Sequence, residues 1–326
     1  MSTVPAPSPV LPSAADPEAA RLAGINLADD EIRATLAPFV LELYPPGDAR
    51  FRARHARLMT KWRLKRAKRV VLGALAGLRR TQAYVEQSYE TTFAQRPWPE
   101  TLPPVTPETK PTLADWGEEG LLVRRYGLGR AHLLLMARTI AALAPRNVLE
   151  VGCGTGINLF VLAAQLPGVE WTGIELTQTG VAQANQVIGA PALPKLLADY
   201  CPAPVADAEA HRRVVVQRGN AMKLDFPDKH FDMVITRQAL EQMDMIREPV
   251  LREIARVARR HVVLTEPFAD FNRDPLRRTY VAAKDYFSLP VAGLQGFGIT
   301  PLRATNAFPQ NVCLGIGMVV GRTGQA

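Results

Sequence analysis

The sequence predicts an α/β fold in which helices alternate with the strands of a parallel sheet. Two observations support this prediction. Short apolar segments alternate with helical segments through the C-terminal two thirds of the chain, as expected when parallel strands are connected by helices. The first of these strands runs into the segment VLEVGCGTG, residues 148–156, which places glycine at positions 152, 154 and 156.

The glycine-rich segment predicts a turn that binds a ligand. Glycine permits positive φ and lets a ligand approach the backbone closely. The helix expected over 157–167 would add free N–H groups at its start. Open α/β sheets bind cofactors at such carboxyl ends of strands. The dinucleotide pattern G-x-G-x-x-G is excluded because it needs glycine where the chain has Ile157 or Leu159, and the Gly-Lys-Ser/Thr end of a P-loop is absent.

The pattern E-x-G-x-G-x-G resembles motif I of the class I S-adenosylmethionine-dependent methyltransferases. The resemblance extends from residue 116 to the C-terminus, through VEWTGIEL, a third strand with its turn over 214–226, FDMVIT, HVVLTEP and two closing segments. It implies a Rossmann-like sheet of seven strands in the order 3-2-1-4-5-7-6, with the last strand antiparallel. A helical N-terminal extension would precede this domain.

The resemblance also implies S-adenosylmethionine as the cofactor, with roles for the residues of motif I. Gly152, Gly154 and Gly156 would pass beneath the methionine part of the cofactor. Glu150 would order this loop and face the amino end of the methionine. Cys153 belongs to the same loop as a small packed residue, not as a nucleophile.

Three later segments complete the implied cofactor site. Glu175 ends the second strand and would hold the ribose hydroxyls, because a carboxylate is a suitable acceptor for a diol. Leu176 would flank the adenine. Asn220 and Ala221 stand where the family usually has Asp-Ala, and the Asn carbonyl oxygen would accept from the adenine amino group. Two residues at the end of the fourth strand would offer backbone groups to the methionine amino end: Thr236 and Arg237.

Catalysis in this family rests on alignment and on exclusion of water, so no fixed catalytic residue is implied. The family often has Leu-Glu-His after the fourth strand, where this chain has Leu-Glu-Gln. Glu241 is the candidate base; alternatively, it is a carboxylate that favours the start of a helix. Arg124, Arg125 or Tyr126 would close over the methionine carboxylate or, alternatively, anchor the next helix at the surface.

Two insertions interrupt the expected domain. Residues 190–213 precede the third strand, at the amino end of the sheet, and we expect a structural or interface role for them away from the cofactor. Residues 268–298 follow the fifth strand on the reactive face and would form a substrate lid. Tyr280, Tyr286 and Phe287 are candidate walls for the substrate together with Gln238, or they pack in the core.

Composition divides the chain of 326 residues into three parts. Residues 1–20 are rich in Pro, Ala and Ser, lack the features of a secretory signal, and predict a disordered tail. Residues 21–112 predict a basic helical extension and a proline-rich linker, and the extension includes a helix over 28–43 that is interrupted near Pro38. Residues 113–326 are expected to form the methyltransferase domain. The three cysteines are far apart and fit no metal site, which favours a reducing cytoplasm.

The net charge of +8 is concentrated in one segment, because residues 50–80 contain twelve Lys or Arg and no acid. Phe51, Leu58 and Trp62 form an apolar stripe on the helix expected there. Three interpretations of this basic segment remain. It packs on the domain as a cap, it binds an anionic membrane or an acidic carrier protein through this stripe, or it binds the phosphates of a nucleic acid.

The expected function is methyl transfer to a small-molecule, lipid or glycan-linked acceptor, in the cytoplasm or peripherally at a membrane. The segment TRQA at 236–239 excludes the Asp/Asn-Pro-Pro-aromatic motif of amino-methylating DNA enzymes. No cysteine is suitably placed for cytosine-C5 chemistry. The alternatives are an RNA- or protein-directed methyltransferase, and a scaffold that binds the cofactor without turnover.

Overall fold

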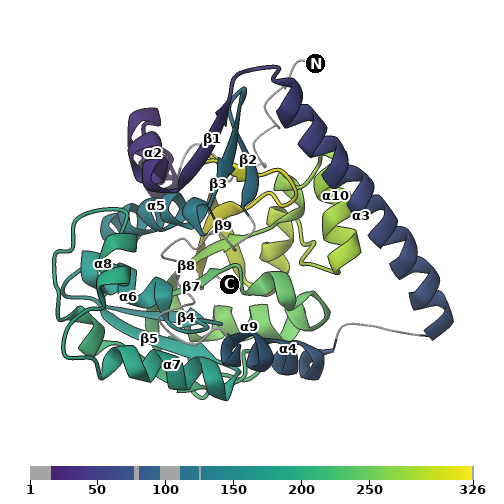
Figure 1. Cartoon of the computed structure of the whole chain (residues 1–326). Helices are drawn as coiled ribbons and strands as arrows, with labels where there is room; N and C mark the ends of the chain where they lie inside the picture. The colour runs from purple at the N-terminus through teal and green to yellow at the C-terminus, as the bar shows by residue number, and fades with distance from the viewer. Residues whose placement is uncertain (1–15, 77–80, 96–110, 125, 325–326) are drawn as a thin grey trace.

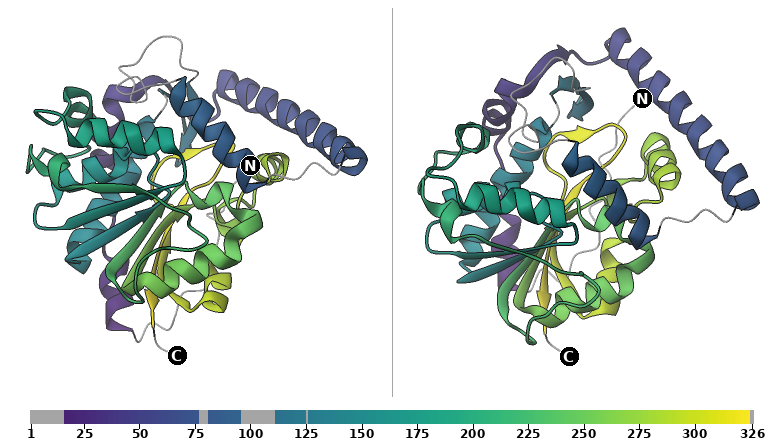
Figure 2. Two further views of the ribbon diagram at one scale, coloured as in Figure 1. Left: turned by 90° about the horizontal axis from the view of Figure 1, so that it is seen from below. Right: turned by 60° about the horizontal axis from the view of Figure 1, so that its bottom comes forward.

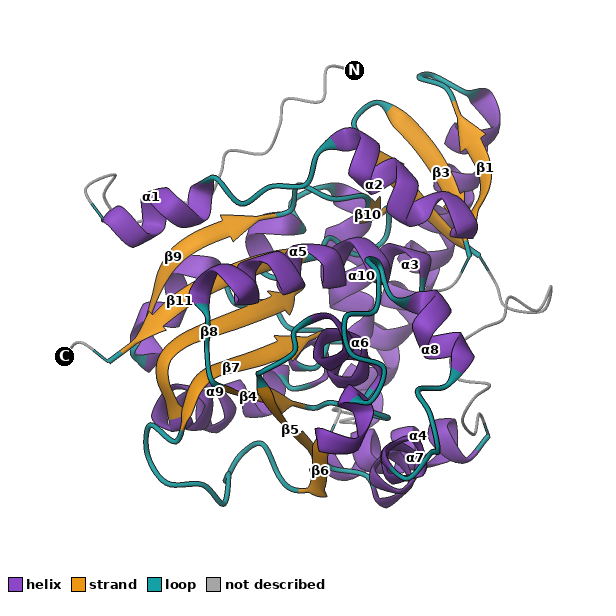
Figure 3. Ribbon diagram, turned by 90° about the vertical axis from the view of Figure 1, so that its left-hand side faces the viewer, coloured by secondary structure: helices purple, strands orange, loops and turns teal. Residues whose placement is uncertain are grey.

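The computed structural model describes residues 16–76, 81–95, 111–124 and 126–324. Its centre is a seven-stranded sheet in the order β6-β5-β4-β7-β8-β11-β9 (Figures 1 and 3). The strands are β4 (Asn147–Val151), β5 (Glu170–Glu175), β6 (Val215–Arg218), β7 (Phe231–Arg237), β8 (Ala258–Glu266), β9 (Ile299–Thr305) and β11 (Gly317–Thr323). Strand β11 is antiparallel to both of its neighbours, and the pairs from β6 to β8 are parallel. The predicted strand order is confirmed.

The central strands are apolar because helices cover both faces of the sheet (Figure 2). Val148 belongs to one hydrophobic cluster and the next residue, Leu149, to the other. Helices α5 (Gly127–Leu143), α6 (Ile157–Gln165) and α7 (Gln178–Ile188) contribute to the first cluster. Helix α9 (Arg247–Val257) and the 3-10 segment Val291–Phe297 contribute to the second. The core therefore lies on both sides of the sheet.

A second, four-stranded antiparallel sheet joins the N-terminal segment to this domain. It has the order β1-β3-β2-β10, with β1 (Val40–Tyr44), β2 (Thr112–Trp116), β3 (Glu119–Val123) and β10 (Gln310–Asn311). The helix predicted over 28–43 is therefore wrong beyond residue 39. Helix α2 (Asp29–Leu36) is followed by a short 3-10 turn, and the β-rich segment VLELY pairs with β3 instead.

Part of the expected tail is also ordered. Helix α1 (Pro17–Ala23) begins at Asp16, whose carboxylate accepts hydrogen bonds from the N–H groups of Glu18 and Ala19. Leu22 is fully buried. The ion pairs of Arg322 with Asp16 and Glu18 fix this helix beside the end of the central sheet. The rest of the predicted tail, residues 1–15, lies outside the described residues.

Helix α3 (Ala49–Ala76) is the long basic helix, and its N-terminal half packs on the domain (Figure 1). Trp62 is only 8% exposed and lies edge-on to Tyr280 of helix α10 (Pro275–Lys284), with ring centroids 4.4 Å apart. Phe51 and Leu58 are partly buried in the same cluster. The stripe therefore packs on the domain as in the first of the three interpretations, and the buried Trp62 cannot face a membrane.

Between residues 63 and 71, most side chains of helix α3 are exposed to solvent. Leu64, Val70 and Val71 are 67%, 64% and 56% exposed. Arg69 forms an ion pair with Asp285, 2.7 Å from nitrogen to oxygen, which holds this part of the helix beside α10. None of the described helices combines the length and apolar character needed to cross a bilayer.

We predict that Trp62→Ala lowers the free energy of unfolding by about 3 kcal/mol, because it removes a large buried ring and leaves a cavity. Urea denaturation followed by circular dichroism measures the change. Leu64→Ala, on the exposed part of the same helix, is the control and should stay within about 0.5 kcal/mol of the wild type. Equal effects of the two substitutions would contradict the packing of Trp62.

Candidate functional site

The glycine-rich turn between β4 and α6 has the backbone conformation that its sequence predicts. Gly152, Gly154 and Gly156 have φ of 74°, 57° and 80°, a region that disfavours side chains. A Cβ at Gly152 would lie 2.7 Å from the Cβ of Ala239, which is closer than packing allows. A Cβ at Gly154 would meet only Phe93, at 3.5 Å. The turn is therefore tightly packed below and more open above.

Glu175, at the end of β5, fixes this turn. Its Oε2 accepts a hydrogen bond of 2.9 Å from the N–H of Gly154, and its Oε1 accepts from the N–H and the hydroxyl of Thr177. Thr177 in turn caps helix α7. Because each carboxylate oxygen has two lone pairs, Oε2 retains an acceptor position for a ligand hydroxyl. Glu175 is 7% exposed, and that exposed part faces a cavity.

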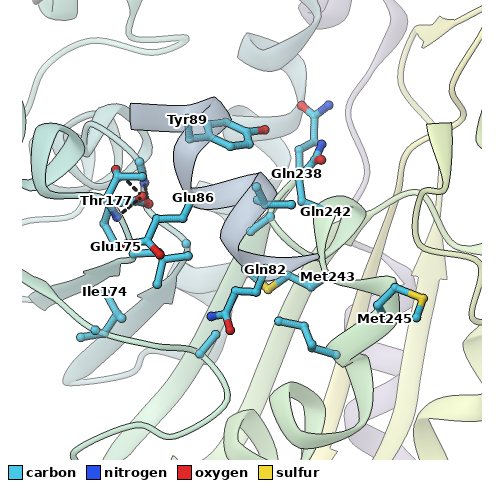
Figure 4. A pocket seen from close by; sticks show the side chains of 18 of the residues that line it. Gln82, Glu86, Tyr89, Ile174, Glu175, Thr177, Gln238, Gln242, Met243 and Met245 are labelled. Carbon is cyan, nitrogen blue, oxygen red and sulfur yellow. Dashed lines mark hydrogen bonds between the residues drawn. The ribbon is translucent and has the colours of Figure 1, made fainter. Parts of the chain in front are cut away.

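We call this cavity the Glu175 cavity. Its floor is formed at the carboxyl ends of the strands by Ile174, Leu176, Gly219 and Ala221. Its roof is helix α4 (Gln82–Ala94). Figure 4 shows Gln82, Glu86 and Tyr89 of this helix between Glu175 and Thr177 on one side and Gln238 and Gln242 on the other. Apolar floor and aromatic roof suit a flat ring, and Glu175 suits a sugar diol.

Polar contacts attach α4 to the domain. The Glu90 carboxylate accepts hydrogen bonds from the N–H groups of Gln178 and Thr179, in the first turn of α7, where a negative charge is favourable. Arg218 forms an ion pair with Glu86, 2.9 Å long. These contacts place a helix of the N-terminal extension over the sheet.

Two further contacts join α4 to the domain. The side-chain amide of Gln183 donates to the carbonyl of Phe93, and that of Gln82 donates to Oδ1 of Asn220. They lie towards opposite ends of the helix, so the roof is held along its length.

A second cavity, the Arg124 cavity, has a volume of about 430 Å³ and meets the first at the glycine turn. The residues that line both cavities are Tyr89, Phe93, Gly152, Gly154 and Gln238. The charged and polar side chains that line the second cavity include those of Arg124, His132, Asn158, Tyr200, Arg237 and Glu241. A ligand that passes over the glycine turn therefore reaches from the Glu175 carboxylate to this group.

A buried chain of polar contacts supports the turn from below. The side-chain amide of Asn158 donates to Oε1 of Glu150 at 2.7 Å, and Arg237 donates to Oδ1 of Asn158 at 3.0 Å. Glu150 is fully buried, and burial raises its pKa to about 7. The first acid of the motif thus orders the start of α6 through Asn158 and does not line either cavity.

Two carboxyl groups lie after β7 and at the end of β8. Glu266 is fully buried and accepts a hydrogen bond from the N–H of Ala239, while burial and the charge of Glu241 raise its pKa to about 8. Glu241 is 8% exposed, lines the Arg124 cavity and accepts from the amide of Gln242 at 2.8 Å. Glu241 is therefore the carboxylate that faces a ligand, and Glu266 stays protonated at neutral pH.

Comparison with known proteins agrees with this geometry. Residues 149–265 match a protein-family model described as a methyltransferase domain. That segment contains the glycine turn, Glu175 and Glu241. The segment that carries the glycine turn is thus similar to a methyltransferase domain.

Individual relatives share less with the chain. An uncharacterized protein of Haemophilus influenzae is 33% identical over 98 residues, which are 30% of this chain and 32% of that protein, so the match spans about a third of the relative's length. Magnesium protoporphyrin IX methyltransferase from Synechocystis PCC 6803, solved with bound SAH, is 13% identical with a TM-score of 0.50 over 75% of this chain and 100% of that chain. This likeness shows a shared fold. The YcgJ protein of Bacillus subtilis has a TM-score of 0.43 and 18% identity over 60% of this chain and 98% of that chain.

Most of the residues that the sequence predicts for the methyltransferase site line one of the two cavities. They are Gly152, Cys153, Gly154, Glu175, Leu176, Ala221, Arg237, Gln238 and Glu241. Burial raises the pKa of the Cys153 thiol well above its usual value, so this residue stays neutral as a packed side chain. Gly156 and Thr236 support the turn and the strand from positions outside the cavity walls.

Asn220 lies beside the Glu175 cavity, while its neighbours Gly219 and Ala221 line it. Its Oδ1, which was expected to accept from an adenine amino group, accepts instead from the amide of Gln82 and from the N–H of Met222. Asn220 therefore connects the roof helix to the turn after β6.

Tyr280, Tyr286 and Phe287, expected as candidate walls for the substrate, line neither cavity. Phe287 is fully buried against Phe268, with ring centroids 5.4 Å apart. Tyr280 packs between Trp62 and Tyr286. Phe287 therefore packs in the core, whereas Tyr280 also lines a third cavity between helix α3 and the second sheet.

Sequence reasoning missed many of the residues that line the cavities, including Tyr89, Phe93, Tyr200 and Gln310. Tyr89 and Phe93 come from the roof helix, and Gln310 comes from β10. Tyr200 ends helix α8 (Lys195–Tyr200) in the insertion 190–213, which was expected to lie away from the cofactor. The Tyr200 hydroxyl donates to the carbonyl of Tyr126, so this insertion reaches back to the start of α5. The sequence signal that could have identified this contact is Tyr200 itself, an aromatic residue that follows an apolar segment of the insertion.

We predict that the substitution Glu266→Gln, which removes a buried acid, makes the free energy of unfolding less dependent on pH. The folded state raises the pKa of Glu266 from 4.5 to about 8, so it binds this proton more tightly than the unfolded state does. Stability from this group is therefore lost as pH rises from about 4.5 to about 8. The variant should gain stability over the wild type across this window, on the order of a few kcal/mol.

The midpoints of urea denaturation, measured from pH 5 to pH 8, test this expectation. This range lies roughly between the pKa of Glu266 in the unfolded state and its pKa in the folded state. Glu248→Gln is the control, because this side chain is 66% exposed in an ion pair on α9. Parallel pH profiles of Glu266→Gln and the wild type would contradict the assignment.

Proposed function

We propose that this protein binds S-adenosylmethionine and transfers its methyl group to a small acceptor in the Arg124 cavity. The observation that carries the proposal is the continuity of the two cavities over the glycine turn, with Glu175 at one end and Glu241 at the other. When bound, the cofactor supplies an electrophilic methyl group on a positively charged sulfur.

The residues present fit this cofactor. Oε2 of Glu175 retains an acceptor position for a ribose hydroxyl, and Leu176 and Ala221 offer apolar surface to the adenine. Arg237 lies beside the turn as a cation for the methionine carboxylate. Tyr89 and Phe93 cover the junction of the two cavities and exclude water from it, which favours transfer of the methyl group over side reactions.

Glu241 is the proposed proton acceptor. It is the carboxylate that lines the Arg124 cavity, and the hydrogen bond from the Gln242 amide orients it. An acceptor hydroxyl or amine placed against Glu241 would lose its proton to this carboxylate as the new bond to the methyl carbon forms.

The proposed acceptor is a small molecule because the cavity is confined. Its walls come from the glycine turn, α5, β10 and the roof helix, and its volume of about 430 Å³ suits a ligand of metabolite size. An RNA- or protein-directed enzyme would need a wider opening at the methyl group. A scaffold without turnover would not need a carboxylate such as Glu241 beside that position.

We predict that Glu175→Ala weakens binding of the product S-adenosylhomocysteine by at least about a hundredfold, because charge-assisted hydrogen bonds to the ribose are lost. Isothermal titration calorimetry measures the affinity. Glu170→Ala, an exposed residue at the start of the same strand, should leave it unchanged. Wild-type protein that does not bind the product would refute the proposed function.

Helix α3 supports a second proposal, association with an anionic membrane surface. In its exposed part, Leu64, Val70 and Val71 stand among cations that form no ion pair with any described residue. These cations are Arg63, Lys65, Arg66 and Lys68. Apolar groups among cations suit a lipid surface. Base stacking on RNA would need exposed aromatic rings, and Trp62 is buried.

We predict that the protein sediments with vesicles that contain phosphatidylserine and much less with vesicles of phosphatidylcholine. The double substitution Lys65→Glu and Arg66→Glu should lower binding by more than about tenfold, since each cation contributes about 1 kcal/mol near such a surface. Arg260→Glu, an exposed cation on β8, is the control. Preference for a single-stranded RNA over the charged vesicles would contradict the membrane proposal.

A further inference from the structure

We infer that the acceptor is a small organic anion whose carboxylate or phosphate binds Arg124. This inference rests on the proposed function and adds the chemical class of the acceptor. It follows from the charges around the Arg124 cavity, from the elements that supply them, and from the polar groups that the protein leaves unpaired there.

The cavity has an excess of positive charge. Arg124 and Arg237 line it, and Glu241 is its carboxylate. His132 also lines it but stays neutral, because burial and the nearby charge of Arg237 lower its pKa well below the usual value. The two guanidinium groups thus outnumber the carboxylate.

Neither arginine forms an ion pair with a residue that the structure describes. The buried Glu150 interacts electrostatically with Arg237, but the Asn158 amide lies between their polar groups. Arg237 donates to the neutral amide of Asn158. The Nε atoms of both Arg124 and Arg237 are buried and lack a hydrogen-bond partner. A cation withdrawn from water without a partner is unfavourable, so an anionic ligand would stabilise this arrangement.

The two arginines belong to different parts of the cavity wall. Arg237 ends β7 and is fixed to Asn158 at the start of α6, directly beside the glycine turn. This position suits the carboxylate of the cofactor itself. Arg124 directly follows β3 of the second sheet, whose strands β2 and β10 contribute Thr112, Gln310 and Asn311 to the same wall. An anion at Arg124 would therefore belong to the acceptor.

Two other polar side chains of this wall already form hydrogen bonds within the protein. The Gln310 amide donates to the carbonyls of Asn306 and Phe308, and its oxygen accepts from the N–H of Ile316. Oδ1 of Asn311 accepts from the N–H of Cys313. Arg124 thus remains as the charged recognition group of this wall.

A second unpaired group accompanies Arg124. Nδ1 of His132 is buried without a partner, and the imidazole packs on Phe308 with centroids 4.5 Å apart. Leu128, Leu314 and Ile316 supply apolar surface nearby. The wall therefore suits a ligand with an apolar body and one oxyanion, which the planar fork of a guanidinium binds through two parallel hydrogen bonds.

The test uses full-length protein saturated with S-adenosylhomocysteine, so that the cofactor's own anion site is filled. Thermal unfolding is followed while benzoate, phenyl phosphate or neutral benzamide is added at constant ionic strength. We expect benzoate or phenyl phosphate, but not benzamide, to raise the Tm, because a ligand that binds the folded state stabilises it. The comparison of benzoate with phenyl phosphate shows which oxyanion is preferred.

Two substitutions separate the acceptor site from the cofactor site. Arg124→Gln should weaken binding of the preferred anion by about tenfold or more and leave the affinity for S-adenosylhomocysteine unchanged. Arg237→Gln should weaken binding of S-adenosylhomocysteine. Arg52→Gln, an exposed arginine on α3 without a described ion pair, controls for the loss of positive charge elsewhere and should change neither.

Several results would overturn the inference. One is an equal response to benzoate, phenyl phosphate and benzamide; another is the lack of any response in wild-type protein that binds S-adenosylhomocysteine normally. A third is an Arg124→Gln variant that loses affinity for S-adenosylhomocysteine and keeps its response to the anion, which would assign Arg124 to the cofactor. Failure of wild-type protein to bind S-adenosylhomocysteine refutes the proposed function instead, so the two failures are distinguishable.

Discussion

The hydrogen bond from the Gly154 N–H to the Glu175 carboxylate is the contact on which the site depends. It joins the turn after β4 to the end of β5, and the same carboxylate holds Thr177, which caps α7. One buried side chain thus sets the positions of two strand ends and one helix start. Because the Glu175 carboxylate also faces a cavity, the group that orders the site is the group that can bind a ligand there.

The N-terminal segment completes the site that the central sheet begins. Strand β1 extends the second sheet, α3 covers α10, and α4 forms the roof of the Glu175 cavity. The roof is held by hydrogen bonds and an ion pair to α7, β6 and the turn after β6, and not by a large apolar contact. The chain therefore builds its cavities from segments far apart in sequence, and the N-terminal extension contributes to them.

The features that could be predicted from the sequence are those that depend on residues close together in the chain. Three glycines on alternate positions specify a turn with positive φ, and an apolar strand ending in Glu175 specifies the neighbouring strand, so the order of the sheet and the ribose acid followed. The contacts of α4 could not be predicted in this way, because Glu90 and Thr179 are 89 positions apart and neither residue type signals the other. Tyr280 and Phe287 were ambiguous for a related reason: an aromatic residue suits a cavity wall and a core equally, and the position of α3 decides between them.

Strand β1 also covers an edge of the second sheet that could otherwise pair with another protein chain. In the sheet order β1-β3-β2-β10, strand β3 is shielded by β1 along one side. A shortened chain that began at residue 113 would leave the hydrogen-bonding groups of β3 open on that side, with the apolar residues Leu121 and Leu122 beside them. Unpaired strand edges of this kind recruit other chains and promote aggregation. The N-terminal segment therefore protects the solubility of the fold as well as covering its cavity.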